Sequence, residues 1–293
     1  MSKEVSVPSF VVAGTQKAAT TWLYECFNEH PEVHVPTIKE LHYFCDPDVC
    51  GKSRRALGFD WYQQQFACND NQKVRGELSI DYMYYPEIPS LLAKLNPELK
   101  VLFVLRDPID RAYSAYWMSR RNHVNYPPFA EFLNEESDFV ARGFYHRQIE
   151  RYRACFPDEQ IFIRIYEDIA ADPGAFLSEV FEFLNVDPQV RPPSMVRRVA
   201  ATRALNPTLS TFLYSRASRL LKIRPVLWLW RQVRRRQAAS AAKAGDKGNG
   251  GGTAASRYEP MTASDRDTLR RIYREENERL FDLLGRRIAQ WDI

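Results

Sequence analysis

A short strand, a tight turn and a helix start follow one another near the beginning of this chain. Residues 10–13 read Phe-Val-Val-Ala, an apolar and β-branched run typical of a strand buried on both faces of a sheet. Gly14 ends the run, and the apolar residues of 20–27 recur at helical spacing. Such a turn gathers unpaired backbone N–H groups and the positive end of a helix dipole around one point. The stretch therefore predicts an anion site, and phosphate is the anion that such turns commonly hold.

The turn carries side chains that suit an anion but depart from the motif of nucleoside-triphosphate enzymes. Lys17 supplies a full positive charge, and Thr20 and Thr21 supply hydroxyl donors. The triphosphate motif G-x-x-x-x-G-K-[ST] needs a second Gly and a Lys directly before the hydroxyl residue. Here Ala18 and Ala19 separate Lys17 from Thr20. From this loop alone, the alternative remains open that Lys17 is a surface residue of a strand–helix turn and binds no anion.

A second strand also ends in a basic residue and leads into a helix. Residues 100–105 form a buried strand pattern, Arg106 follows directly, and residues 109–120 have the pattern of a helix that carries Ser114. In open α/β sheets, ligands bind outside the carboxyl ends of the strands. Arg106 and Ser114 therefore predict a second phosphate subsite close to the first.

A carboxylate and an imidazole lie between these two motifs. Glu40 and His42 are two residues apart, so in a strand or a turn both side chains can reach one substrate hydroxyl. An E-x-H pair is common on protein surfaces. Its position shortly after the phosphate loop favours a catalytic role.

In this order, the motifs resemble those of sulfotransferases that use 3′-phosphoadenosine 5′-phosphosulfate (PAPS). The spacing G-x-x-K-x-x-T-T-W from Gly14 to Trp22 is similar to the 5′-phosphosulfate loop of that family, with Ala19 in place of the usual Gly. Residues 105–114 look like its 3′-phosphate motif, R-[DN]-P-x-x-R-x-x-S. Residues 39–44 resemble the K-E-x-H-F-F segment of the heparan sulfate branch.

The resemblance implies a role for each matching residue. Glu40 would be the general base, His42 its partner, and Lys17 the group that neutralises charge on the leaving oxygen. The 3′-phosphate would lie against Arg106 and Ser114. The other residues of the implied nucleotide site are Gly14, Thr15, Gln16, Ala18, Ala19, Thr20, Thr21, Trp22 (over the adenine), Tyr145, Arg257 and Tyr258.

Residues 75–82 resemble the strand end E-x-S-x-x-Y of the same family. On that resemblance, Glu77 holds a lysine or arginine near the sulfuryl group, and Ser79 donates a hydrogen bond there. A structural ion pair is the alternative for Glu77. We expect residues 46–72, which are polar and aromatic, to wall the acceptor cleft; a simple packing loop is the alternative.

Length and composition favour one domain over residues 1–293. The strand–turn–helix motifs and the resemblance imply an α/β fold in which a P-loop-like parallel sheet is flanked by helices. The net charge of +4 suits an anionic cofactor or acceptor but is too small to indicate a nucleic acid partner. Five cysteines without a paired metal spacing indicate a reducing compartment and predict no metal. The first strand begins almost at the N-terminus, which leaves no room for a signal peptide, so we expect a cytoplasmic location.

The C-terminal third departs from the family pattern. Residues 189–237 read as a helical insert in which arginines alternate with Leu and Trp. Such a segment is typical of a helix at a membrane surface, and we expect peripheral contact with the inner membrane through 212–236; a packed hairpin over the acceptor site is the alternative. Residues 238–256 are rich in Gly and Ala and predict a flexible linker or lid. Residues 257–293 resemble the nucleotide-clamp loop and final helix.

The sequence therefore predicts an enzyme of EC 2.8.2 type that moves the sulfuryl group of PAPS to a hydroxyl or amine and releases 3′-phosphoadenosine 5′-phosphate (PAP). The acceptor would be a carbohydrate, a glycolipid or another amphiphilic small molecule. One alternative is a nucleotide-dependent phosphotransferase, which the missing second Gly of the loop disfavours. The other is a non-catalytic protein that binds membrane surfaces on an inactive nucleotide fold.

Overall fold

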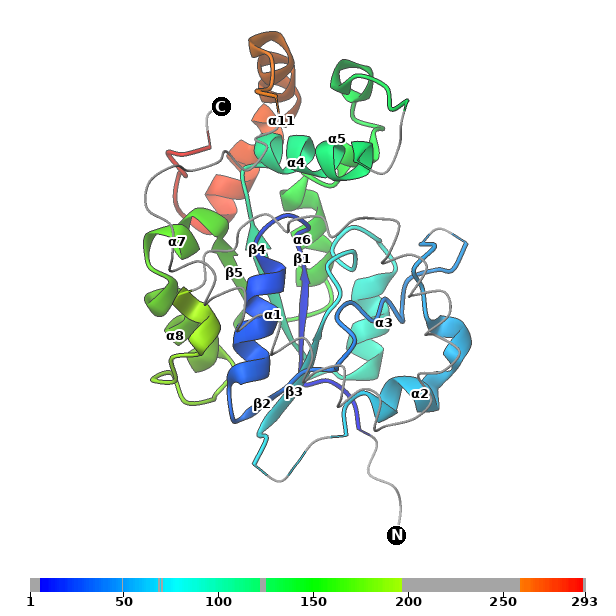
Figure 1. Ribbon diagram of the computed structural model, residues 1–293, viewed down its shortest axis with the longest axis vertical. Helices are drawn as coiled ribbons and strands as arrows, with labels where there is room; N and C mark the ends of the chain where they lie inside the picture. The colour runs from blue at the N-terminus through cyan, green and yellow to red at the C-terminus, as the bar shows by residue number, and fades with distance from the viewer. Residues whose placement is uncertain are drawn as a thin grey trace, which may run out of the picture. The chain divides into compact units, whose positions relative to one another are not determined.

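A parallel sheet lies at the centre of the computed structural model, which describes residues 6–48, 50–67, 69, 71–121, 125–196 and 259–291. Its strand order in these residues is β2-β3-β1-β4-β5, and every neighbouring pair is parallel (Figure 1). The strands are β1 (Phe10–Gly14), β2 (Val33–His34), β3 (Val74–Leu78), β4 (Lys100–Leu105) and β5 (Ile161–Ile165). The structure confirms the predicted α/β fold with a parallel sheet flanked by helices.

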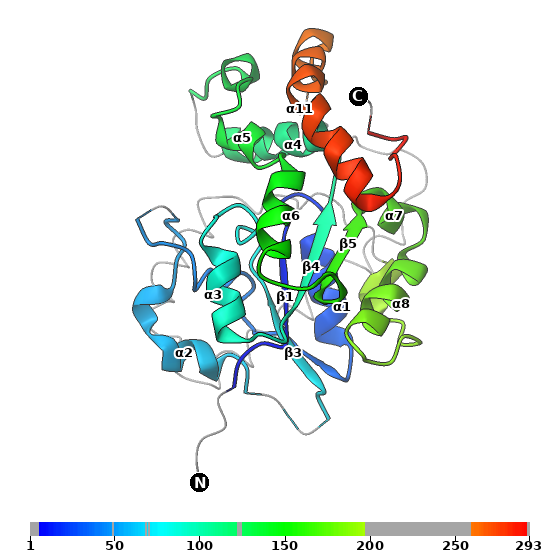
Figure 2. The same ribbon diagram turned by 180° about the vertical axis from the view of Figure 1, so that it is seen from behind.

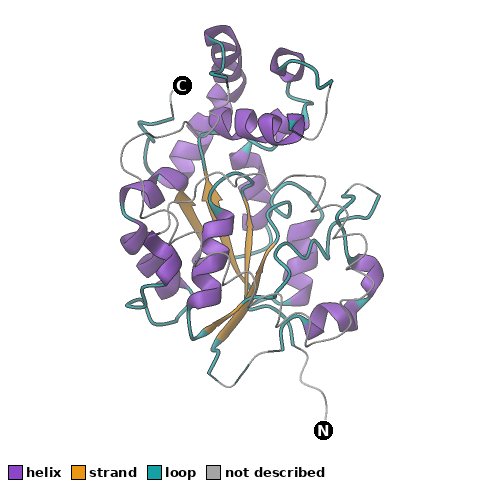
Figure 3. Ribbon diagram, in the orientation of Figure 1, coloured by secondary structure: helices purple, strands orange, loops and turns teal. Residues whose placement is uncertain are grey.

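Helices connect the strands and cover the sheet (Figure 3). The α-helices are α1 (Thr20–Glu29), α2 (Phe59–Gln64), α3 (Ile88–Leu95), α4 (Pro108–Arg120), α5 (Asp138–Ala141), α6 (Tyr145–Arg153), α7 (Tyr166–Ala171), α8 (Pro173–Phe183) and α11 (Ala263–Leu284). Short 3-10 helices are η1 (Arg55–Leu57), η2 (Phe129–Phe132), η3 (Asp158–Gln160) and η4 (Pro193–Val196).

The side chains of β1 alternate between two hydrophobic clusters. Phe10 and Val12 pack with residues of α1 and α8, whereas Val11 and Ala13 pack with residues of α3, α6 and α11. Figures 1 and 2 show these two helical layers from opposite sides of the sheet. All four side chains are fully buried. The apolar run is therefore continuous because both faces of the strand are covered.

Backbone hydrogen bonds bring three segments to the same edge of the sheet. The Thr15 amide donates to the carbonyl of Val104 at 2.9 Å, and the Ser79 amide donates to the carbonyl of Val12 at 3.1 Å. The segments that follow β1, β3 and β4 therefore leave the sheet side by side. This edge, formed by the carboxyl ends of the strands, is where the sequence predicted a ligand.

The final helix begins with a capped first turn. Thr262 is the N-cap of α11: its backbone is extended (ψ 151°), and its side chain accepts a hydrogen bond from the Asp265 amide at 3.1 Å. A cap residue must lie outside the helix while its side chain reaches back to the first turn. Ser264 already lies within the helix and does not meet this condition.

Several predictions fall outside the described residues. Of the predicted insert 189–237, the structure describes only 189–196; it does not describe the linker 238–256 or the clamp residues Arg257 and Tyr258. The domain limits and the membrane contact through 212–236 therefore remain predictions. Among the described helices, none combines the length and the apolar character that crossing a bilayer requires.

The close contact between β1 and β3 generates a prediction. A Cβ atom at Gly76 would lie 2.5 Å from the ring of Phe10, which is buried in the core. We expect Gly76→Ala to lower the free energy of unfolding by roughly 1–3 kcal/mol, because a buried ring must shift. Urea unfolding measures the effect. The control is Gly51→Ala, where a Cβ meets no atom within 4 Å; equal losses in both variants would contradict this account of the packing.

Candidate functional site

The loop between β1 and α1 has a backbone suited to an anion. Lys17 and Ala19 have φ angles of 75° and 57°, in the left-handed region that glycine adopts most easily. Ala19 is the N-cap of α1 and makes no side-chain cap hydrogen bond. The first turn of α1 thus keeps amide donors at the positive end of its dipole. Ala19 stands where the family motif usually has Gly. Its left-handed backbone explains why glycine is the usual residue there.

The other predicted loop residues support this backbone. Gly14 is required because a Cβ there would lie 2.7 Å from the sulfur of Met83. Thr15, Ala18 and Thr20 are buried, whereas Gln16 is half-buried and Thr21 is exposed.

Positive charge gathers beside the loop. The Arg106 guanidinium donates to the Lys17 carbonyl at 3.2 Å. Burial, followed by the charges of Arg106, Arg121 and Arg111, lowers the pKa of the Lys17 amine below its ordinary value of 10.5. Such a cluster of like charges repels itself until an anion is bound. The structure therefore brings together the residues assigned to the two phosphate subsites, Lys17 and Arg106.

Arg106 is held by its neighbours. Its guanidinium lies over the ring of Tyr166, 5.2 Å from the centroid, and its carbonyl accepts a hydrogen bond from the Tyr145 hydroxyl at 2.9 Å. Tyr145 is buried, so in this structure it supports the strand end and has no free hydroxyl to offer the predicted nucleotide. Ser114 lies on α4 with 8% of its surface exposed.

Arg111 lies in the core beneath this surface. It is fully buried and donates to the carbonyl of Phe139. Its Nε and Nη1 atoms have no hydrogen-bond partner among the described residues. Arg111 is therefore a structural residue of the core.

An ion pair joins the candidate base to the phosphate loop. The Lys39 ammonium lies 2.7 Å from Glu40 Oε1 and 3.3 Å from Thr21 Oγ1 at the start of α1. The other carboxylate oxygen, Glu40 Oε2, lies 3.3 Å from His42 Nε2. The predicted pair is therefore formed. Lys39, the first residue of the K-E-x-H-F-F segment, links this pair to the loop.

The charges around Glu40 keep it ionised. Burial raises the pKa of its carboxyl, but the hydrogen bond to His42 and the Lys39 ammonium outweigh that effect and lower the pKa to about 2. Glu40 and His42 have φ angles of 63° and 48°, which non-glycine residues adopt at a cost and often at functional sites. The Arg54 guanidinium holds this turn by donating to the carbonyls of Glu40 and Leu41 at 2.6 and 3.1 Å.

Glu77 does not bind a lysine or an arginine in the described part of the chain, which corrects the predicted ion pair. Its Oε1 accepts hydrogen bonds from the hydroxyls of Tyr62 at 2.7 Å and Tyr82 at 3.3 Å, and its Oε2 accepts from Ser79 at 2.7 Å. Burial raises the pKa of Glu77, and these hydrogen bonds oppose the rise. Hydroxyl groups can satisfy a buried carboxyl without a second charge.

Ser79 also differs from its predicted role. Its hydroxyl proton points to Glu77, and its oxygen accepts the backbone N–H of His42 at 3.1 Å. In this arrangement it positions His42 and has no proton to offer a sulfuryl group. A short chain of hydrogen bonds therefore fixes the backbone of His42 to the end of β3.

Trp22 is a core residue, which corrects the predicted adenine contact. Its indole is 5% exposed, its Nε1 donates to the carbonyl of Ser194 at 3.0 Å, and its ring packs against Phe176 at a centroid distance of 6.0 Å. An indole enclosed in this way has no open face for a base. The apolar spacing of the helix explains this position, because Trp22 lies on the buried face of α1.

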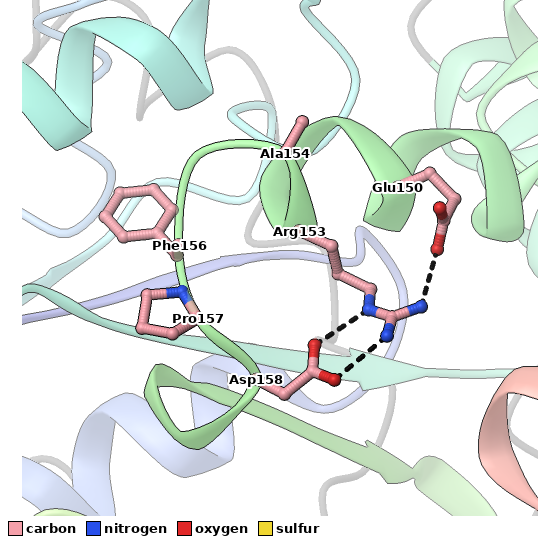
Figure 4. Close-up of a pocket in the computed structure, with 6 residues that line it drawn as sticks. All are labelled: Glu150, Arg153, Ala154, Phe156, Pro157 and Asp158. Atoms are coloured by element: carbon pink, nitrogen blue, oxygen red, sulfur yellow. Dashed lines mark hydrogen bonds and ion pairs between the residues drawn. The ribbon is translucent and has the colours of Figure 1, made fainter.

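An open pocket elsewhere on the surface is not part of this site. Figure 4 shows it beside the C-terminal end of α6, where Arg153 forms ion pairs with Glu150 at 2.9 Å and Asp158 at 2.8 Å. Asp158 precedes β5, so the pocket lies at the amino ends of the strands. The phosphate loop lies at the opposite edge.

The ion pair of Glu40 generates a pH-dependent prediction. Because its folded pKa is about 2 and its ordinary value is 4.5, the stabilisation is fully present above pH 4.5 and is lost as the pH falls toward 2. We expect Glu40→Gln to lower the free energy of unfolding by roughly 1–2 kcal/mol near about pH 6, and by less near about pH 3.5.

Urea unfolding of both proteins at both pH values measures this difference. The control is Glu25→Gln, because Glu25 is an exposed carboxylate on α1. A loss of stability in Glu40→Gln that stays constant as the pH falls would argue against the ion pair.

Comparison with known proteins identifies relatives of this chain. The model of the sulfotransferase domain family matches residues 8–279. Heparan sulfate glucosamine 3-O-sulfotransferase 5 of Homo sapiens is 28% identical over 196 residues, which cover 63% of this chain and 55% of that protein. Bifunctional heparan sulfate N-deacetylase/N-sulfotransferase 4 of Mus musculus is 27% identical over 303 residues, which cover 96% of this chain and 30% of that protein. The chain thus spans about half or less of the length of these curated relatives.

A solved structure shares the fold. The sulfotransferase from Alicyclobacillus acidocaldarius superposes with a TM-score of 0.70 at 22% identity, covering 98% of this chain and 99% of that one. The order of the strands, the cationic loop after β1 and the match of the family model over nearly the whole sequence lead to one conclusion: the chain belongs to the sulfotransferase family.

Proposed function

We propose that this protein transfers the sulfuryl group of PAPS to a hydroxyl or amine of a carbohydrate, a glycolipid or another amphiphilic small molecule. The observation that supports it best is the Lys39 ammonium, which lies within hydrogen-bond distance of both Glu40 and Thr21. Through this contact the candidate base lies beside the first turn of α1. An acceptor at Glu40 would therefore lie next to an anion on the loop.

Residues around the loop would bind and orient the donor. Lys17 and the amides of the first turn of α1 would hold the 5′-phosphosulfate, and Arg106 and Ser114 would hold the 3′-phosphate. Lys17 stabilises the charge that develops on the bridging oxygen as PAP leaves. This reaction needs no metal, because the cations that neutralise the charge come from side chains.

Glu40 would act as the general base. The acceptor oxygen or nitrogen forms a bond to sulfur, the bond from sulfur to the phosphate oxygen breaks, and the acceptor proton moves to the Glu40 carboxylate. The low pKa keeps Glu40 ionised at neutral pH but makes it a weak base. We infer that Lys39 turns from Glu40 to the sulfuryl oxygens when the donor binds, which raises the basicity of Glu40 at the moment of transfer. His42 holds the second carboxylate oxygen in place.

Exposed apolar side chains in the segments on either side of the Glu40–His42 pair support an amphiphilic acceptor. Ile38, Leu57 and Phe59 are 38%, 54% and 40% exposed. Phe59 lies on α2, and its ring is 6.3 Å from that of Tyr43, the residue after His42. Leu57 and Phe59 belong to the segment 46–72 that was predicted to wall the acceptor cleft, and Ile38 lies two residues before Glu40. Rings of this kind suit the apolar face of a sugar or a lipid.

Donor binding tests the first half of the proposal. We expect calorimetric titration to show micromolar binding of PAP and weaker binding of ATP and of adenosine 5′-phosphosulfate, which lack the 3′-phosphate. Arg106→Ala should weaken PAP binding by roughly 10- to 100-fold, because a charge-assisted contact is lost.

The control for donor binding is Arg153→Ala, which removes an arginine at the opposite edge of the sheet and should leave PAP affinity unchanged. Equal binding of ATP and PAP would favour a phosphotransferase instead.

Turnover measurements test the second half of the proposal, the transfer with Glu40 as the general base. With labelled PAPS and a panel of glycan, glycolipid and phenol acceptors, Glu40→Gln should lower kcat by roughly 10²- to 10⁴-fold while PAP affinity changes less than about twofold. Glu25→Gln on the exposed face of α1 should keep full activity. Unaltered turnover in Glu40→Gln would remove Glu40 as the base and make His42 the next candidate.

A further inference from the structure

Three buried side chains with soft metal-binding atoms meet behind the candidate base. A ring nitrogen of His42, Cys45 Sγ and Cys50 Sγ all lie within 4.8 Å of one another. The three residues are 1%, 0% and 5% exposed. Cysteine thiols and a histidine imidazole are the ligands that zinc prefers in proteins. The proposed sulfuryl transfer does not use either thiol.

Cys45 and Cys50 have four residues between them, a spacing that cysteine pairs of zinc sites use, and the prediction of no metal overlooked this pair. The third member is a histidine, and the loop must fold back to bring all three together. The amide of Cys50 donates to the carbonyl of Asp46 at 2.7 Å, which closes a turn and returns Cys50 to the side of Cys45. Ser53 holds the same loop: its hydroxyl donates to the Cys45 carbonyl at 2.7 Å, and its amide donates to the Cys50 carbonyl at 2.9 Å. The two thiols are therefore positioned by backbone structure.

The distances are close to those around a tetrahedral ion. Ligand bonds of zinc place neighbouring nitrogen and sulfur atoms about 3.3–3.8 Å apart. His42 Nδ1 lies 4.0 Å from Cys45 Sγ. Small rotations of the side chains would bring these atoms to the bonding separation.

The carboxylate of Asp81 is a candidate fourth donor beside His42; it lies outside the group whose atoms are all within 4.8 Å of one another and must turn toward the thiols to join it. Asp81 Oδ2 lies 3.7 Å from His42 Nδ1, whereas Asp81 Oδ1 is held by Arg142 at 2.7 Å. Arg142 therefore holds one oxygen of the carboxylate, while the other lies on the side of His42. Lys52, 4.0 Å from Asp81 Oδ2, has an exposed side chain and can turn to solvent.

The second nitrogen of the imidazole also fits. Histidines that bind a metal through one nitrogen usually present the other to a carboxylate, which fixes the ring and its tautomer. His42 Nε2 lies 3.3 Å from Glu40 Oε2. Glu40, His42 and an ion held by the thiols would therefore form the carboxylate–histidine–metal arrangement that is common at metal sites.

We propose that His42, Cys45 and Cys50, with Asp81 as the fourth ligand, form a structural site for a zinc ion. The ion fixes the turn that carries Glu40 and His42, both of which have left-handed backbone angles. The ion itself takes no part in the transfer of the sulfuryl group. Its role is to position His42.

Metal content and a cobalt spectrum test this site in the full chain, purified with a phosphine reductant from zinc-supplemented cultures. After gel filtration in metal-free buffer we expect about one zinc ion per chain. Cobalt added to the zinc-free protein should give a sulfur-to-cobalt charge-transfer band, which reports thiolate ligands directly. Cys45→Ser and Cys50→Ser should each weaken zinc binding by about tenfold or more.

The matched control is Cys26→Ser, since Cys26 is also a buried free cysteine but lies on α1. It should bind zinc and cobalt as the unchanged protein does. The cobalt band of the unchanged protein supports the site even where a Ser variant fails to fold. Absence of both zinc and the band overturns the proposal, as does zinc that stays bound in the double variant Cys45→Ser/Cys50→Ser. A Cys45–Cys50 disulfide in protein purified without reductant, together with no zinc, would also overturn it. These readouts do not depend on the proposed transferase reaction.

Discussion

The position of β1 between two parallel neighbours is the constraint on which the site depends. Parallel strands end at the same edge of a sheet, so the segments after β1, β3 and β4 must emerge together. The hydrogen bonds from the Thr15 amide to Val104 and from the Ser79 amide to Val12 fix the first residue of two of these segments. The cationic loop and the strand end that holds His42 therefore meet at one edge, although more than sixty residues separate them in the sequence.

Charged groups of both signs gather at this edge. Lys17 and Arg106 lie together beside the loop after β1, and the carboxylates of Glu40 and Asp81 lie on either side of His42. Glu77 is buried at the end of β3. Each carboxylate is compensated differently, since burying an uncompensated charge is costly. Glu40 has an ammonium and an imidazole, Asp81 has a guanidinium, and Glu77 has three hydroxyls. Glu40 is linked to the start of α1 through Lys39, which contacts both Glu40 and Thr21.

Local patterns predicted the elements of this fold well because they act over short distances. The apolar run of β1, the break at Gly14 and the helical spacing of α1 each depend on neighbouring residues. The same holds for the pair Glu40 and His42, whose side chains converge within a turn. Predictions that concerned partners far along the chain were less successful. Glu77 binds hydroxyls of Tyr62 and Tyr82 instead of a cation, and Trp22 packs into the core.

The sequence by itself determined the α/β class, the strand that leads into a phosphate-binding turn, and the residue types that an anion and a proton acceptor require. Only the tertiary structure decided which of these groups meet. The contact of Lys39 with both Thr21 and Glu40, and the grouping of His42 with Cys45, Cys50 and Asp81, depend on how a loop folds back and on which strands are neighbours. Hydrogen bonds and burial act between atoms that are close in space, and spacing along a chain does not encode that proximity beyond a turn or two.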